Sequence, residues 1–144
     1  MGELKNVLLV TNGTSEGEIL LIKEASASAK TQGLDIKLTL VHVIPNLPTC
    51  YFNIPSMVLL AENYYEEATK VLTAIGDTLD VLKKDQWLIT GRIKTEVLRL
   101  AHKLDIHFIL ASSTSIQDLH KSFFFMKSRQ TGTPIRSISS LVTI

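Results

Sequence analysis

The sequence predicts an α/β fold, doubly wound, in which helices cover both faces of a mainly parallel five-stranded sheet. Two observations lead to this class: the predicted strands are apolar throughout, and stretches with helical periodicity separate them. A half-exposed antiparallel sheet would instead show a polar residue at every second position. The chain of 144 residues has the length of one typical domain, so we expect residues 1–144 to form a single domain.

The first strand and helix are marked by an apolar run and a turn. Lys5–Thr11 is rich in Val and Leu and is followed by Asn12-Gly13, which is typical of a strand that ends in a turn. Thr14 or Ser15 can cap a helix whose first turn carries two glutamates, where the helix dipole favours negative charge. We expect this helix to run to about Gln32.

The second strand and a long helix follow. Asp35–Val43 is a second apolar strand, and Ile44-Pro45 closes it because the residue before a proline disfavours helix. From Ser56 to Leu82, apolar residues recur at steps of three and four, which predicts one long amphipathic helix weakened midway by Gly76.

The second half of the chain repeats the alternation. Gln86–Thr90 predicts the third strand, the residues from Ile93 to Leu104 the third helix, and Ile106–Ala111 the fourth strand. A fourth helix is expected over Ile116–Lys127 and a terminal strand over Leu141–Ile144. The segment from Ser128 to Ser140 shows no interpretable pattern.

Charge and composition exclude several classes of function. The chain has 15 Lys and Arg against 14 Asp and Glu, and they are scattered, so nucleic-acid binding is not expected. No apolar stretch approaches the roughly 20 residues of a membrane helix, and the N-terminus lacks the pattern of a secretion leader. A single cysteine, Cys50, cannot form an internal disulfide, which favours a reducing compartment. We therefore expect a cytoplasmic protein.

In doubly wound folds, ligands bind at the carboxyl ends of the strands, near the point where the strand order reverses. The turns at Thr11–Thr14, Val43–Ile44 and Ala111–Thr114 occupy those ends in this sequence. A binding site, if the protein has one, is expected there.

The motifs along the chain resemble the universal stress protein family. The resemblance rests on the Asn-Gly-Thr turn after the first strand, on Leu40-Val41-His42-Val43, and on the stretch from Gly91 through Asp105 to Ser112, and it covers essentially the whole chain. In that family the first strand usually ends in an Asp-Gly-Ser-like turn whose acidic residue meets the nucleotide. Asn12 occupies that place here.

Nucleotide-binding members of the family carry the pattern G-x2-G-x9-G-[ST] after the fourth strand, where glycines let backbone N–H groups approach phosphates closely. The same register places Ala111, Thr114, Phe124 and Phe125 at those positions, so none of the three glycines is present. Gly132-Thr133 is a candidate displaced remnant, but it lies beyond the expected spacing. The sequence therefore resembles the branch of the family that does not bind ATP.

Two hypotheses about function follow. The first is a dimeric, cytoplasmic stress-response or interaction module that is not an enzyme and has no cofactor. The second is a nucleotide- or small-anion-binding signalling protein with a degenerate phosphate loop, with weak affinity for ATP or AMP and slow nucleotide hydrolysis. Its site would consist of residues at the three strand ends: Asn12, Val43, Ala111, Ser112, Ser113 and Thr114.

The partner surfaces are expected near the C-terminus. The predicted strand of Leu141, Val142, Thr143 and Ile144 has no helix after it, and an uncovered apolar edge is an aggregation hazard unless it is paired. We expect a homodimer in which this strand pairs with its symmetry mate, as the resemblance also implies. Three consecutive aromatic residues in Phe123–Met126 cannot all enter one core, so this stretch is a second candidate contact for a protein partner.

No residue pattern predicts a metal site or a catalytic centre. The four histidines, His42, His102, His107 and His120, lack the spacing of metal ligands and are expected to be satisfied locally. The serine pairs lack a nucleophile elbow and an assigned base.

Overall fold

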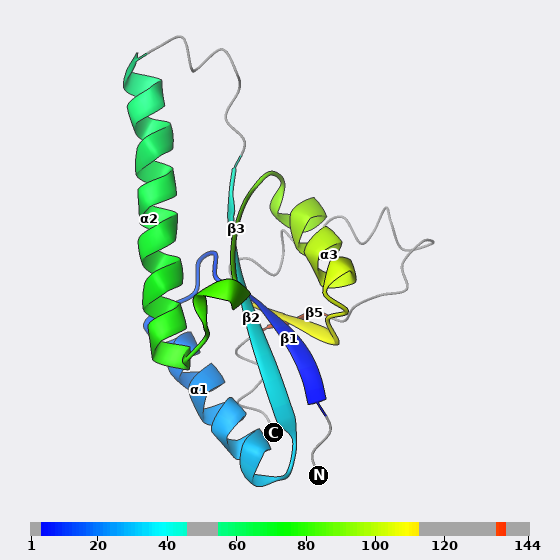
Figure 1. Cartoon of the computed structure of the whole chain (residues 1–144). Coiled ribbons are helices and arrows are strands. Elements are labelled where there is room, and N and C mark those ends of the chain that lie inside the picture. Colours follow the sequence, from blue (N-terminus) through cyan, green and yellow to red (C-terminus); the bar gives the residue numbers. More distant parts are fainter. Residues whose placement is uncertain (1–3, 46–54, 113–134, 138–144) are drawn as a thin grey trace.

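The computed structural model describes residues 4–45, 55–112 and 135–137 (Figure 1). The elements in chain order are β1 (Leu4–Val10), α1 (Glu16–Thr31), β2 (Asp35–Ile44), α2 (Pro55–Leu79), the 3-10 helix η2 (Lys83–Asp85), β3 (Gln86–Thr90), α3 (Ile93–Lys103), β4 (Phe108–Ala111) and β5 (Ile135–Ser137). The five strands form one parallel sheet in the order β3-β2-β1-β4-β5. The predicted α/β class with a parallel sheet is confirmed.

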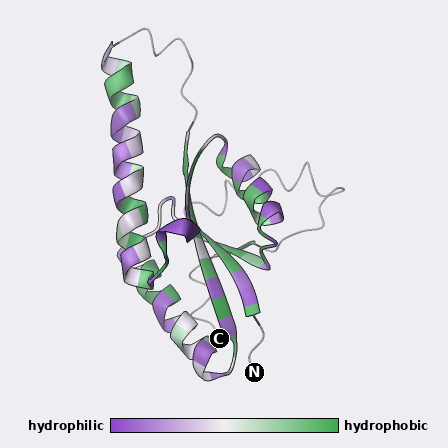
Figure 2. Cartoon of the chain, viewed as in Figure 1, coloured by the Kyte–Doolittle hydropathy of each residue, from purple (hydrophilic) through white to green (hydrophobic). Residues whose placement is uncertain are grey.

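Helices cover both faces of the sheet, with α1 and α2 on one face and α3 on the other (Figure 1). Successive residues of a strand point to opposite faces, so the run of four buried residues in β1 serves two cores. Val7 and Leu9 pack with the residues of α1 and α2, and Leu8 and Val10 pack with those of α3. Figure 2 shows hydrophobic and hydrophilic residues along both the strands and the helices, and the buried positions of the strands are the apolar ones that form the two cores.

The start of α1 follows the sequence prediction closely. Ser15 is the N-cap: its side chain accepts the N–H of Glu18, and the Glu18 carboxylate accepts the N–H of Ser15. This reciprocal pair satisfies two donors that a helix start otherwise leaves unpaired. The helix ends before Gly33, whose positive φ of 83° reverses the chain toward β2.

The long helix is shorter than predicted at its C-terminal end. It stops at Leu79 because Asp80 adopts a positive φ of 56°, and the N–H of Val81 donates to the Gly76 carbonyl. The helix runs through Gly76 without a break. The Gln86 side chain fills the space where a Cβ would lie, and its Nε2 donates to the Val81 carbonyl at 2.9 Å.

Two further boundaries differ from the prediction. β4 begins at Phe108 rather than Ile106, because the Ile106 N–H still donates to Ala101 at the end of α3. β5 comes from the segment that had no interpretable pattern, and it pairs with β4 through Ile109 and Ile135. The expected helix Ile116–Lys127 and the expected strand Leu141–Ile144 lie outside the described residues.

A membrane-spanning helix is not found in the described ranges: none of their helices combines enough length with enough apolar character to cross a bilayer.

Candidate functional site

The strand order reverses between β1 and β4. From β1 the chain moves outward through β2 to β3, and then crosses to β4 on the other side of β1. The residues that follow these two central strands meet, because the Ser112 hydroxyl donates to the Asn12 carbonyl at 3.3 Å. The ends of the first and fourth strands therefore lie side by side at this point.

Asn12 also joins the end of β1 to the end of β2. Its side-chain Nδ2 donates to the Val43 carbonyl at 2.8 Å, and its Oδ1 accepts the Val43 N–H at 2.9 Å. The backbone hydrogen bonds between β1 and β2 end one residue before Asn12, where the Thr11 N–H donates to the Val41 carbonyl at 2.9 Å. The Asn12 amide thus replaces the next backbone pair of the ladder, and we call this arrangement the Asn12 clamp.

The clamp depends on an amide at position 12. An asparagine side chain donates and accepts at the same time, whereas an ionised aspartate only accepts. A carboxylate here would keep the bond from the Val43 N–H but would place an oxygen against the Val43 carbonyl. Asn12, which the sequence presents as the replacement for a ligand-binding acid, therefore has a defined structural partner.

A histidine and a threonine lie beside the clamp. Thr11 Oγ1 lies 2.8 Å from His42 Nδ1 and donates to the Val41 carbonyl at 3.1 Å. Burial lowers the pKa of His42 below its ordinary value, since a buried imidazolium loses hydration. His42 is thus a neutral hydrogen-bonding partner at pH 7. Thr11 is buried, so this pair is a structural contact rather than an accessible nucleophile and base.

The turn after β1 uses its polar groups internally. Gly13 has a positive φ of 69°, as the Asn-Gly sequence predicts. The Thr14 N–H donates to the Thr11 carbonyl at 3.2 Å, and its hydroxyl donates to the Val10 carbonyl at 3.2 Å. The hydroxyl of this turn therefore holds the backbone in place.

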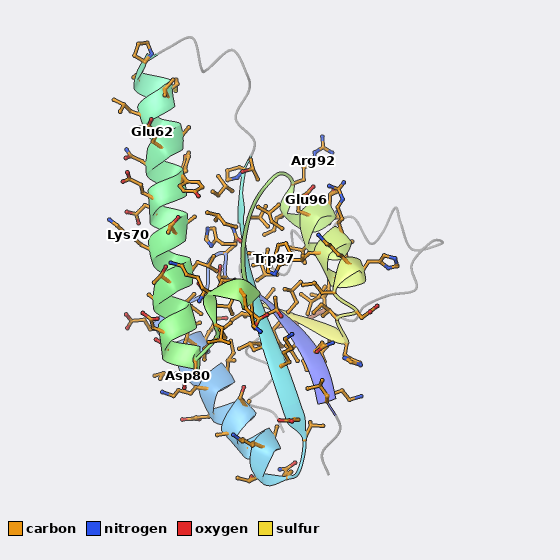
Figure 3. The ribbon with its side chains drawn as sticks, in the orientation of Figure 1. Glu62, Lys70, Asp80, Trp87, Arg92 and Glu96 are labelled. Carbon is orange, nitrogen blue, oxygen red and sulfur yellow. The ribbon has the colours of Figure 1, made fainter. Side chains whose placement is uncertain are left out.

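The end of β3 completes this edge of the sheet. The Gly91 N–H donates to the Ile44 carbonyl at 2.9 Å, and the Glu96 side chain lies over Gly91, where an added Cβ would come within 2.7 Å of it. Both carboxylate oxygens of Glu96 accept from Arg99 at 3.1 Å. Figure 3 shows Glu96 and Arg92 at the start of α3.

Sequence reasoning identified Asn12, Val43 and Ser112, placed Thr11 in the turn after the first strand, and expected His42 to be satisfied locally. It missed two polar residues of this edge, Glu96 and Arg99. The Glu96 and Arg99 spacing of three on a helix was an available signal for their ion pair. The contact between Thr11 and His42 had no local signal, because it depends on the register between β1 and β2.

Several predicted residues are not part of what the structure describes. Ala111 is buried at the end of β4, but Ser113 and Thr114 lie outside the described residues. The same holds for further stretches that the sequence singled out, namely Cys50, His120, Phe123–Met126, Gly132-Thr133 and Leu141–Ile144.

The remaining described histidines lie away from this edge. His107 Nδ1 accepts the Asn6 N–H at 2.9 Å, just before β4 begins, and His102 is exposed on α3. Within residues 4–45, 55–112 and 135–137, no group of three or more His, Cys, Asp or Glu residues is placed to hold a metal ion.

Known proteins resemble this chain both in sequence and in structure. No family model matches the chain. Universal stress protein A homolog 1 of Coxiella burnetii (strain RSA 493 / Nine Mile phase I) is 29% identical over 120 residues, which are 81% of each chain. A crystal structure of a protein from the universal stress protein family of Burkholderia pseudomallei has a TM-score of 0.59 at 15% identity, covering 92% of this chain and 94% of that one.

Proposed function

We propose, from its confirmed resemblance to the universal stress protein family, that this protein is a dimeric stress-response and interaction module that works without ATP. In this proposal the protein is cytoplasmic, is not an enzyme and needs no cofactor. Its function then resides in the surfaces that it presents to partners.

The Asn12 clamp is the observation that carries the proposal. A ribose-binding role at this position would need a side-chain oxygen that is directed to the ligand. The Asn12 amide instead directs its oxygen and its nitrogen to the two backbone groups of Val43. The sequence adds a second argument, since the glycines that would let backbone N–H groups reach phosphates are replaced by Ala111, Thr114 and Phe124.

The dimer is proposed to form through the strand expected over Leu141–Ile144, which lies outside the described residues. Its test is sedimentation at micromolar concentration, comparing the wild type with the variant Val142→Lys. We expect a dimer that the substitution dissociates. A wild type that sediments only as a monomer contradicts this part of the proposal.

The test of ATP independence is a thermal-shift titration with ATP, ADP and AMP. A ligand that binds only the folded state stabilises it by about 2.7 kcal/mol at one hundred times its Kd, so even weak binding becomes visible at millimolar nucleotide. We expect no saturable shift. A saturable shift that Ser112→Ala abolishes, and that the matched change Ser28→Ala on α1 leaves intact, refutes the proposal.

The second candidate function is the nucleotide- or small-anion-binding signalling protein. The meeting of Asn12, Val43 and Ser112 at the point of strand reversal favours it, because ligands of doubly wound folds bind there. In that case Ala111, Ser113 and Thr114 complete the site, ATP or AMP binds weakly, and hydrolysis is slow. The same titration separates the two candidates.

A further inference from the structure

Helix α2 carries an apolar stripe that is buried at one end of the helix and open at the other. In its C-terminal half, Ala68, Leu72 and Ile75 are buried, at the three- and four-residue steps of one helix face. The same steps continue toward the N-terminus. We define the α2 stripe as the residues of this continuation: Met57, Leu60, Ala61, Tyr64 and Tyr65.

The open part of the stripe lies beyond the sheet. The N-terminal end of α2 extends past the carboxyl ends of the strands, so the sheet does not pack against this end of the helix (Figure 1). No residue between 55 and 67 is buried. The exposed fractions are 38% for Leu60, 43% for Tyr64 and 59% for Tyr65.

An open stripe of this kind has an energetic cost. A helical segment of about a dozen residues is only marginally stable in water on its own, and most helix stability in proteins comes from packing an apolar face. Contiguous exposed apolar side chains on soluble proteins mark interaction sites. The stripe therefore has the composition of a surface that becomes buried on binding.

The charges around the stripe define its partner. Glu62, Glu66 and Glu67 are exposed on the same part of α2, and the sequence has no Lys or Arg between residues 55 and 69. None of the three glutamates forms an ion pair with another described residue. At about 100° per residue, Glu62 and Glu67 lie on the two flanks of the stripe, whereas Glu66 lies on the opposite side of the helix, so a cationic partner on the stripe reaches Glu62 and Glu67. Lys70, one turn further on, points away from the sheet (Figure 3).

We propose that the α2 stripe docks a basic amphipathic helix of a partner protein. The partner's apolar residues would cover Leu60 and Tyr64 at helical spacing, and its Lys or Arg side chains would pair with Glu62 and Glu67 on the flanks of the stripe. A second copy of α2 fits less well, because it brings the same three negative charges. The proposal rests on the proposed function as an interaction module and names the chemistry of its partner.

The experiment uses the full chain and a fluorescein-labelled peptide of roughly 18 residues, made of Leu and Lys with the Leu residues on one helix face. Fluorescence anisotropy measures its affinity at low salt and at ~0.5 M salt, where screening weakens ion pairs. The comparison peptide has the same composition in a scrambled order. We expect saturable binding of the amphipathic peptide that weakens with salt, and much weaker binding of the scrambled one.

Two neighbouring leucines provide a matched pair of variants. Leu60 lies in the stripe, whereas Leu59, which is 61% exposed, lies roughly 140° around the helix from Tyr64. Leu60→Ser is expected to weaken binding about tenfold, as loss of an apolar anchor does, and Leu59→Ser to change it less than about twofold. Glu67→Gln should weaken binding at low salt and reduce its salt dependence. If circular dichroism shows that Leu60→Ser loses helix, Tyr64→Ser takes its place.

The proposal is overturned by absence of saturable binding, by equal binding of the scrambled peptide, or by equal losses from Leu59→Ser and Leu60→Ser. It is also overturned if the wild type sediments as a dimer that Leu60→Ser dissociates, since a second copy then covers the stripe. A failure of peptide binding leaves the nucleotide titration and the Val142 test unaffected, so it is distinguishable from failure of the proposed function.

Discussion

Replacing Asn12 by aspartate exchanges one NH₂ group for an oxygen and tests the Asn12 clamp directly. The variant keeps an acceptor for the Val43 N–H but loses the 2.8 Å bond to the Val43 carbonyl. An acceptor in a buried residue that loses its donor costs about 1 to 3 kcal/mol of folding free energy. For a domain of this size the loss corresponds to a fall in Tm on the order of 4 to 12 °C.

The pH dependence of this loss has a definite sign. In the variant, the protonated carboxyl group at position 12 regains a donor for the Val43 carbonyl, so the folded state favours protonation and the pKa of this carboxyl is raised above its unfolded value of about 3.9. The ionised group is therefore destabilising above the folded pKa. The stability deficit of the variant, relative to the wild type, should shrink as pH falls from 7 toward 4.

The assay is urea unfolding at pH 7, 5 and 4, for the wild type, Asn12→Asp and the control Asn63→Asp. Asn63 is exposed on α2, so its substitution introduces the same charge without a buried contact. The control should change the free energy of unfolding by less than about 0.5 kcal/mol at every pH. A variant at position 12 that is as stable as the control at pH 7, or whose deficit is equal at pH 7 and pH 4, refutes the reasoning.

Three further predictions concern Ser15, Gly91 and His42. Ser15→Ala removes the helix cap and should cost about 0.5 to 2 kcal/mol in urea unfolding, so an unchanged midpoint would contradict the capping role. Gly91→Ala should lower Tm because its Cβ would lie 2.7 Å from the Glu96 side chain, and adding Glu96→Ala should recover part of the loss. Because burial lowers the pKa of His42, the unfolded state binds the proton more readily, and wild-type stability should fall as pH drops through 6.5. His42→Gln should flatten this dependence and His102→Gln should not, as urea midpoints at pH 5 to 7 will show.

The sequence predicted those elements whose signals are local. The apolar run of β1, the Ser15 cap and the periodicity of α3 each lie within a few consecutive residues, and their positions agree with the structure to within one or two residues. The end of α2 was wrong because the apolar pattern continues to Leu82, while the positive φ of Asp80 ends the helix earlier. β5 was not predicted, since three residues carry too little periodicity to be distinguished from a loop.

The candidate site was predictable in position but not in chemistry. Topology alone places the residues after β1, β2 and β4 at one edge, and Asn12, Val43 and Ser112 lie there. The role of Asn12 depends on which backbone groups of β2 remain unpaired beyond the end of β1. The register between β1 and β2 decides this, and local sequence does not reveal the register. The hydrogen bonds add that Asn12 closes the sheet between the ends of β1 and β2, which side-chain types alone did not indicate.

The α2 stripe and the strand ends differ in how many of their side chains have partners within the protein. At the strand ends, the amide of Asn12 and the hydroxyls of Thr11 and Thr14 all have partners within the protein. On the α2 stripe, Leu60 and Tyr64 remain exposed and the glutamates beside them have no cationic partner among the described residues. Burial of exposed apolar surface is favourable, so the stripe offers a partner a gain that the sheet edge, whose polar groups are already paired within the protein, does not.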